Sequence, residues 1–93
     1  MVYLQITMRI ASSNRALAAG VYTRYKQPFL DQVPGAKSKD LLIRDEDIQV
    51  MHGFNSSDNA KAYLQSTLFN DDVVRELKPL MQDNPDIHIY ESA

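Results

Sequence analysis

Residues 2–10 alternate strictly between apolar and polar side chains, and this pattern constrains the fold more than any other. The apolar positions are Val2, Leu4, Ile6, Met8 and Ile10. A period of two is that of a β-strand, because successive side chains of a strand point to opposite faces. One face of this strand is fully apolar, so the chain is expected to begin with a strand that packs against a second layer on one side only.

A helix is predicted to follow this first strand. Ser12 to Asn14 offer side-chain caps for a helix start, and a stripe at helical spacing comes next, namely Ala18, Val21, Tyr22 and Tyr25. Pro28 lacks the N–H that an unbroken helix uses, so a kink or a restart is expected there. The segment Val33-Pro34-Gly35 is expected to end the helical unit.

The rest of the chain predicts two strands, a helical region and a last strand. Residues 37–54 form two strands around the charged tip 44–47, a length suited to a hairpin. Residues 55–57 offer caps for a second helix, and Asn70 to Asp72 are expected to interrupt it and cap a further helical turn. Residues 86–91 alternate again as a strand.

The order β-α-β-β-α-β predicts an α+β, ferredoxin-like fold with a four-stranded antiparallel sheet and both helices on one face. The other face of such a sheet is left open. Strand parity places Tyr3, His88 and Tyr90 on that open face. A surface this bulky predicts a homodimer in which these three residues meet the partner subunit.

The length and the composition of the chain predict one ordinary folded domain over residues 1–93. With 44% hydrophobic residues, the chain supplies one core, and its net charge of −2 with scattered cations argues against nucleic-acid binding. The absence of cysteine excludes disulfides and a thiol nucleophile. There is neither a signal-peptide pattern nor a run of roughly 18 apolar residues, so a cytoplasmic protein without a membrane segment is expected.

Three stretches carry a resemblance to a known family: VYLQITMRI, PFLDQVPGAKSKDLLIRDEDIQVMHGF and NAKAYLQSTLF. Together they resemble the dimeric α/β-barrel superfamily, and within it the small antibiotic biosynthesis monooxygenase-like proteins. The resemblance covers almost the whole chain and rests mainly on the order of elements. It implies a homodimer with facing sheets and a substrate cleft between sheet and helices in each subunit.

Relatives of this kind differ in activity, so the resemblance implies a range of functions. Some oxidise electron-rich phenols or quinols with O₂ and no metal or flavin, whereas others bind or degrade haem, isomerise lactones or have no known activity. This sequence has no tryptophan, and the Asn-Tyr-Trp type of constellation cannot be aligned to it. No catalytic residue is therefore carried over from the family, and the site residues below come from face and residue type.

His52 is the predicted catalytic residue. It shares the apolar face of its strand with Val50 and Phe54, so the imidazole is expected on the helix side of the sheet, where it could take a proton from an enol or a phenol. The alternative interpretation is a half-buried histidine that only packs and forms a hydrogen bond at a strand end.

Four further residues are predicted to bind substrate. Tyr22, Tyr25 and Tyr63 lie on the inner stripes of the two predicted helices, where a phenol could orient a substrate oxygen. Asn55 could donate a hydrogen bond to an oxyanion at the mouth of the cleft. The alternatives are that the tyrosines are core residues and that Asn55 is only a helix cap.

No metal site and no cofactor are predicted. The two histidines lie on opposite faces of the sheet and cannot share an ion within one subunit, and the acidic tip lacks the spacing of a calcium loop. The sequence contains no P-loop, GxGxxG, GxSxG or HExxH motif. The leading hypothesis is a cofactor-independent oxygenase acting on a small aromatic or quinol-type molecule. The alternatives are a non-catalytic dimer that binds a small ligand, for example in a stress response, and a haem-binding relative.

Overall fold

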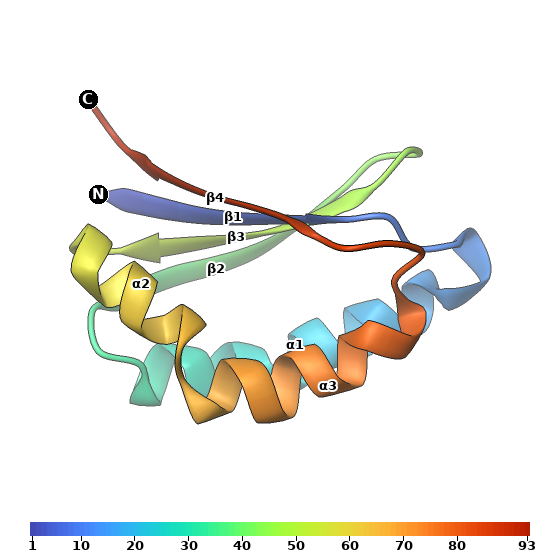
Figure 1. Ribbon diagram of the computed structural model, residues 1–93, viewed down its shortest axis with the longest axis horizontal. Coiled ribbons are helices and arrows are strands. Elements are labelled where there is room, and N and C mark those ends of the chain that lie inside the picture. Colours follow the sequence, from blue (N-terminus) through green and yellow to red (C-terminus); the bar gives the residue numbers. More distant parts are fainter.

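Four strands form one antiparallel sheet in the computed structural model, which describes residues 1–93 (Figure 1). The strands are β1 (Val2–Met8), β2 (Ala36–Ile43), β3 (Ile48–Phe54) and β4 (Asp86–Glu91). Their order across the sheet is β2-β3-β1-β4. This order, with helical connections after β1 and β3, is the ferredoxin-like arrangement, so the predicted fold class is confirmed.

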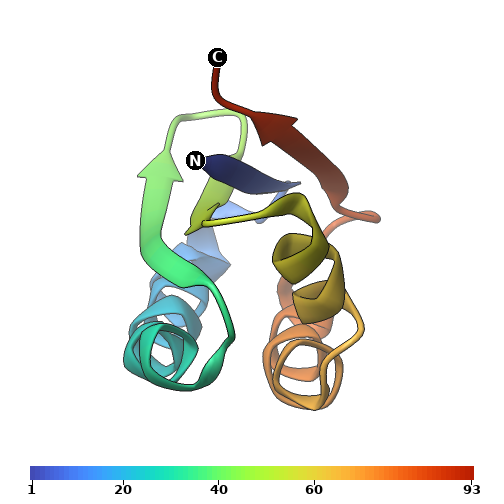
Figure 2. The ribbon, with the colours of Figure 1, turned by 90° about the vertical axis from the view of Figure 1, so that its left-hand side faces the viewer.

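The helical segments form a single layer against one face of the sheet. They are η1 (Ser12–Asn14), α1 (Arg15–Gln32), α2 (Ser57–Leu64), the π-helical stretch η2 (Leu68–Val73), α3 (Val74–Leu77) and η3 (Lys78–Leu80). Seen end-on, α1 runs under the β2 side of the sheet, and the stretch from α2 to α3 runs under the β4 side (Figure 2). The opposite face of the sheet carries no helix.

The core lies between the sheet and these helices. The alternating apolar residues of β1 are all buried, and Leu4 is fully enclosed. Phe29 from α1, Phe54 from β3 and Tyr63 from α2 meet in an aromatic cluster, with ring centroids 5.0 to 6.0 Å apart. Burying a large aromatic side chain stabilises a domain by about 2 to 3 kcal/mol, so this cluster holds the two helical segments to the sheet.

Two local predictions differ from the structure. The chain does not restart at Pro28, because α1 is continuous from Arg15 to Gln32. Pro28 removes one backbone hydrogen bond from the helix. The adjacent Phe29 is fully buried, and its packing keeps the helix continuous across the proline. Asn70 does not cap a new helix, because it lies inside η2, where its side chain donates to the carbonyl oxygens of Leu64 and Ser66.

The end of α1 and the start of α2 are fixed by residues that the sequence marked as a helix end and a helix cap. Gly35 has φ 79°, a left-handed conformation that ends the unit after α1. Ser56 caps α2, because its hydroxyl oxygen accepts a hydrogen bond from the N–H of Asn59 at 3.2 Å. Asn55 stands just before this cap, and its backbone N–H donates to the carbonyl of Gly35 at 3.0 Å. These contacts join the two connections at the same end of the sheet.

Candidate functional site

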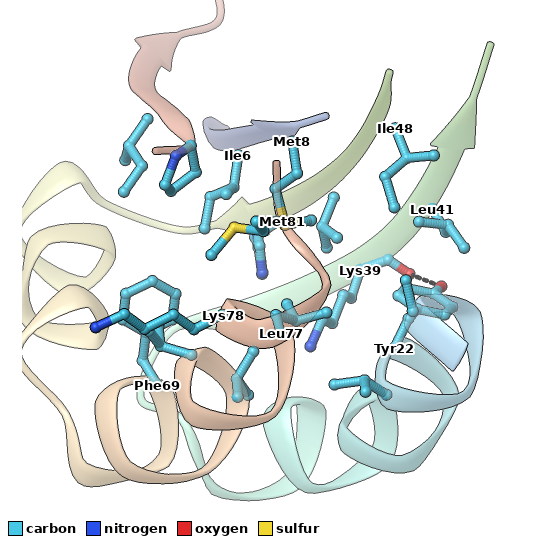
Figure 3. Close-up of a pocket in the computed structure, with 18 of the residues that line it drawn as sticks. Ile6, Met8, Tyr22, Lys39, Leu41, Ile48, Phe69, Leu77, Lys78 and Met81 are labelled. Carbon is cyan, nitrogen blue, oxygen red and sulfur yellow. Dashed lines mark hydrogen bonds between the residues drawn. The ribbon is translucent and has the colours of Figure 1, made fainter. Parts of the chain in front are cut away.

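A cavity of about 290 Å³ lies between the sheet and the helices (Figure 3). Fourteen of its 20 lining residues are hydrophobic, so a ligand there would be mostly apolar. An apolar protein cavity of about 150 Å³ holds benzene, so this space suits a molecule of one to two aromatic rings. Exposed Lys78 and Asn84 are also part of the lining, which brings the cavity to the surface beside η3 and β4.

Lys39 is the only charged residue among the buried ones, and it lines this cavity. The residue is 3% exposed, and its side chain extends from β2 into the space between sheet and helices (Figure 3). No carboxylate lies within salt-bridge distance of the ammonium group. Burial without a counter-ion disfavours the charged form and lowers the pKa of Lys39 to about 8.

His52 lies directly opposite Lys39 in the β2-β3 pairing and lines the same cavity. Its Nδ1 lies 3.1 Å from the carbonyl oxygen of Leu4; because a carbonyl can only accept, Nδ1 carries the hydrogen and donates it. Burial, assisted by the charge of Lys39, lowers the pKa of His52 to about 3. The ring is therefore neutral at physiological pH, and Nε2 keeps a free lone pair.

Of the predicted tyrosines, Tyr22 lines the cavity and Tyr25 does not. The hydroxyl of Tyr22 donates to the backbone carbonyl of Lys39 at 2.7 Å, which ties α1 to β2 beside the cavity (Figure 3). The hydroxyl of Tyr25 instead contacts the carboxylate of Glu76, which also pairs with Arg24. These contacts join α1 to α3.

Neither Tyr63 nor Asn55 lines the main cavity. Tyr63 is 2% exposed, its ring packs against Phe29 and His52, and its hydroxyl has no hydrogen-bond partner. Burial raises the pKa of this phenol above its ordinary value, so it stays protonated. Asn55 is exposed, and its side-chain oxygen accepts a hydrogen bond from Asn59 at 2.8 Å.

The three residues predicted for a dimer interface lie together on the open face. Tyr3 of β1 is paired with Tyr90 of β4, and His88 stands two residues before Tyr90. The rings of His88 and Tyr90 are 6.1 Å apart, and Tyr90 is 54% exposed. The structure therefore gathers these side chains into one aromatic surface, the open-face patch.

Metal-ligating residues do not converge anywhere in the structure. No three histidine, aspartate or glutamate side chains could share one ion. A tetrapyrrole such as haem is larger than the one to two aromatic rings that a cavity of about 290 Å³ suits.

Lys39 was not among the site residues predicted from the sequence, although the sequence contained a signal for it. The predicted hairpin tip spans residues 44–47, and counting outward from it pairs residue 43 with 48 and residue 39 with 52. That register places Lys39 beside His52 on the helix side. Burial of this side chain is not expected from the sequence, because a lysine near the edge of a sheet is normally solvated.

Several solved structures have this fold. They include candidate antibiotic biosynthesis monooxygenases from Nitrosomonas europaea (TM-score 0.83, 10% identity, 99% of this chain and 98% of that chain), from Bordetella bronchiseptica (0.84, 12%, 99% and 97%) and from Caulobacter crescentus (0.84, 16%, 99% and 89%). No protein-family model matches the sequence, and no curated protein matches it.

These comparisons define the class of fold. The chain has the ferredoxin-like fold of the antibiotic biosynthesis monooxygenase-like proteins over almost its whole length, which confirms the resemblance at the level of the fold. None of its helices is both long and apolar enough to cross a membrane. Activity must be argued from the site, because one fold hosts many chemistries.

Proposed function

We propose that this chain is an oxygenase-like enzyme that oxidises a small aromatic quinol, phenol or enol with O₂, without a metal or a flavin. One observation carries the proposal: an unpaired lysine and a neutral imidazole face the same small apolar cavity. The names of the similar structures support the reaction class. The cavity supports the substrate class, since it suits a molecule of one to two rings with one acidic oxygen.

The two cavity residues differ in their ability to take the proton. A phenol has an ordinary pKa near ~10, so transfer to an imidazole with a pKa of about 3 is uphill by roughly 9 to 10 kcal/mol. Transfer to the amine of Lys39, with a pKa of about 8, is uphill by only about 3 kcal/mol. We therefore assign the base to Lys39 in its neutral form, which becomes the counter-ion of the resulting anion.

His52 is then a hydrogen-bond acceptor for the substrate and not the base that the sequence predicts. Its Nδ1–H is bound to Leu4, so Nε2 can accept a hydrogen bond from a second substrate hydroxyl. An electron-rich anion held between these groups can pass electrons to O₂ in a cavity that excludes most water. In the monooxygenase outcome, one oxygen atom replaces two hydrogens on the substrate as a carbonyl, and the other leaves as water.

Oxygen uptake tests this proposal with a panel of quinols, enols and polyphenols, corrected for spontaneous oxidation. Lys39→Met should lower the enzymatic rate by roughly 10²-fold or more, because it removes both base and counter-ion. The rate should rise with pH towards the pKa of Lys39 near 8. Lys61→Met, on the exposed side of α2, is the matched control and should leave the rate unchanged.

A pair of histidine variants separates packing from chemistry. His52→Asn keeps an N–H that can donate to Leu4 but lacks the equivalent of Nε2, whereas His52→Gln places an amide near the Nε2 position. If Nε2 binds substrate, Asn should lose activity and Gln should keep part of it. Equal activity in wild type and His52→Asn would remove His52 from the mechanism.

The rival function is a non-catalytic protein that binds the same class of ligand. One observation favours it: the hydroxyls of Tyr22 and Tyr25 are already engaged in structural hydrogen bonds, so few polar groups remain free for chemistry. A panel compound that raises the melting temperature without any oxygen uptake would support this rival over the enzyme. For the assembly, we propose a homodimer in which a second copy covers the open-face patch.

A further inference from the structure

The surroundings of Lys39 are those of a nucleophile rather than of an ion pair. The ammonium nitrogen lies 5.3 Å from the ring centroid of Phe29 and 5.9 Å from that of Tyr22, and no carboxylate neutralises it. The adjacent Asp40 points to the other side of β2 and is exposed. Aromatic faces attract a cation only weakly, so they do not offset the hydration free energy that the ammonium group loses when it is buried.

This environment makes the free amine available at neutral pH. With a pKa of about 8, roughly a tenth of Lys39 is unprotonated at pH 7, compared with about 0.03% of an ordinary lysine. The other four lysines, Lys26, Lys37, Lys61 and Lys78, are half-buried or exposed. A desolvated amine in an apolar pocket is the form in which lysine attacks carbonyl carbons.

The cavity also provides space and access for a carbonyl compound. Its volume of about 290 Å³ exceeds what one aromatic ring needs, and its exposed rim at Lys78 and Asn84 opens to solvent. Ile6, Met8 and Leu77 supply apolar walls around the space that the Lys39 side chain enters (Figure 3). A neutral, mostly apolar molecule would enter with little loss of hydration.

We propose that Lys39 condenses reversibly with small apolar aldehydes or ketones to form an imine. The amine nitrogen attacks the carbonyl carbon, a C–N bond forms, and the carbonyl oxygen takes up both protons of the amine and leaves as water. No oxidant or reductant is consumed. The reaction does not depend on the oxygenase function proposed above, because O₂ takes no part in it.

Reductive trapping tests the inference on the intact protein. Native protein is treated at pH 7 with benzaldehyde and cyanoborohydride, and the position of the added benzyl group is mapped by peptide mass spectrometry. Lys39 should be labelled about tenfold faster than the mean of the other lysines, because its gain in free amine outweighs its lower basicity. The preference should disappear in urea, where every lysine is solvated.

Two controls make the result specific to the cavity. A bulky aldehyde, 1-pyrenecarboxaldehyde, should label the exposed lysines and spare Lys39. Lys39→Met should abolish the fast phase, whereas Lys37→Met, on the same strand but exposed, should retain it. Slow labelling of Lys39 in the native protein, or equal preference before and after addition of urea, would overturn the inference. Oxygen uptake is measured separately, so either proposal can fail while the other stands.

Discussion

Lys39 and His52 are two buried polar side chains that face one cavity. Burial disfavours the charged form of each and lowers both pKa values; at pH 7 this costs stability through Lys39, which is mostly charged, and hardly at all through His52, which is neutral. Tyr63 adds a third buried polar group, because its hydroxyl has no partner. Buried polar atoms that do not improve stability are frequent at functional sites, where residues are retained for chemistry.

Replacing Lys39 should therefore stabilise the protein. The unfolded chain keeps the Lys39 proton up to a pKa of 10.5, whereas the folded protein releases it near 8. Below pH 8 the folded state bears the full cost, and between these values the unfolded state binds more protons, so stability rises with pH. Lys39→Met should raise the free energy of unfolding at pH 7 by about 3 kcal/mol, and the gain should shrink as the pH approaches 10.5.

Urea unfolding at several pH values measures this effect. Lys37→Met is the matched control, and it should change the free energy of unfolding by less than about 0.5 kcal/mol because its side chain is exposed. A Lys39→Met variant less stable than wild type at pH 7 would show that the ammonium has a stabilising partner in solution.

At the scale of elements, the helices are positioned by their ends. Gly35 closes the connection between α1 and β2 in a left-handed conformation, and a Cβ there would collide with the side chains of Asn55 and Asn59. Those two side chains are hydrogen-bonded to each other beside the start of α2. Gly20 lies inside α1, and a Cβ there would meet open space. The backbone therefore requires a glycine at position 35, whereas nothing in the structure requires one at position 20.

This contrast predicts substitutions of opposite sign. Gly35→Ala should lower the free energy of unfolding by about 1 to 3 kcal/mol, because alanine is strained at positive φ and crowds both asparagines. Gly20→Ala should raise it by about 0.5 to 1 kcal/mol, because alanine favours a helix more than glycine does. Thermal and chemical unfolding of the two variants would decide the matter. A neutral Gly35→Ala would mean that the α1-β2 connection can adopt another conformation.

At the scale of the whole molecule, the sheet has one covered face and one open face (Figure 2). The open-face patch combines Tyr3, His88 and Tyr90, and it extends over the paired strands β1 and β4. A small domain with a thin core gains from covering such a surface with a second copy.

Tyr90→Asp should convert the proposed dimer into monomers, because it would place an unpaired charge inside the sheet-sheet contact. Size-exclusion chromatography with light scattering measures the mass directly. Ala16→Asp, in the exposed first turn of α1, adds the same charge away from the patch and should leave the mass unchanged. A monomeric wild type, or a Tyr90→Asp variant of unchanged mass, would rule out this interface.

The amino-acid sequence by itself determined the fold and the faces of β1, β3 and β4 that meet the helices. Alternation in β1 and β3 predicted which side chains meet the helices, because periodicity two leaves only two choices and the apolar face must be buried. His52 was placed correctly on the helix side of the sheet in this way, and Tyr22 was placed on the inner stripe of α1 by its helical spacing. The restart predicted at Pro28 is absent, because tertiary packing, with Phe29 fully buried, keeps α1 continuous across the proline.

Only the tertiary structure decided which polar groups share a cavity. The burial of Lys39 depends on α1 lying over β2, and the contact of Tyr25 with Glu76 of α3 holds its hydroxyl outside the cavity. Sequence spacing predicts which face of a helix or strand a residue lies on. The distance between residues on two different elements depends on how those elements pack. The lowered pKa of Lys39 follows from that packing, because the helices that cover β2 remove the amine from water.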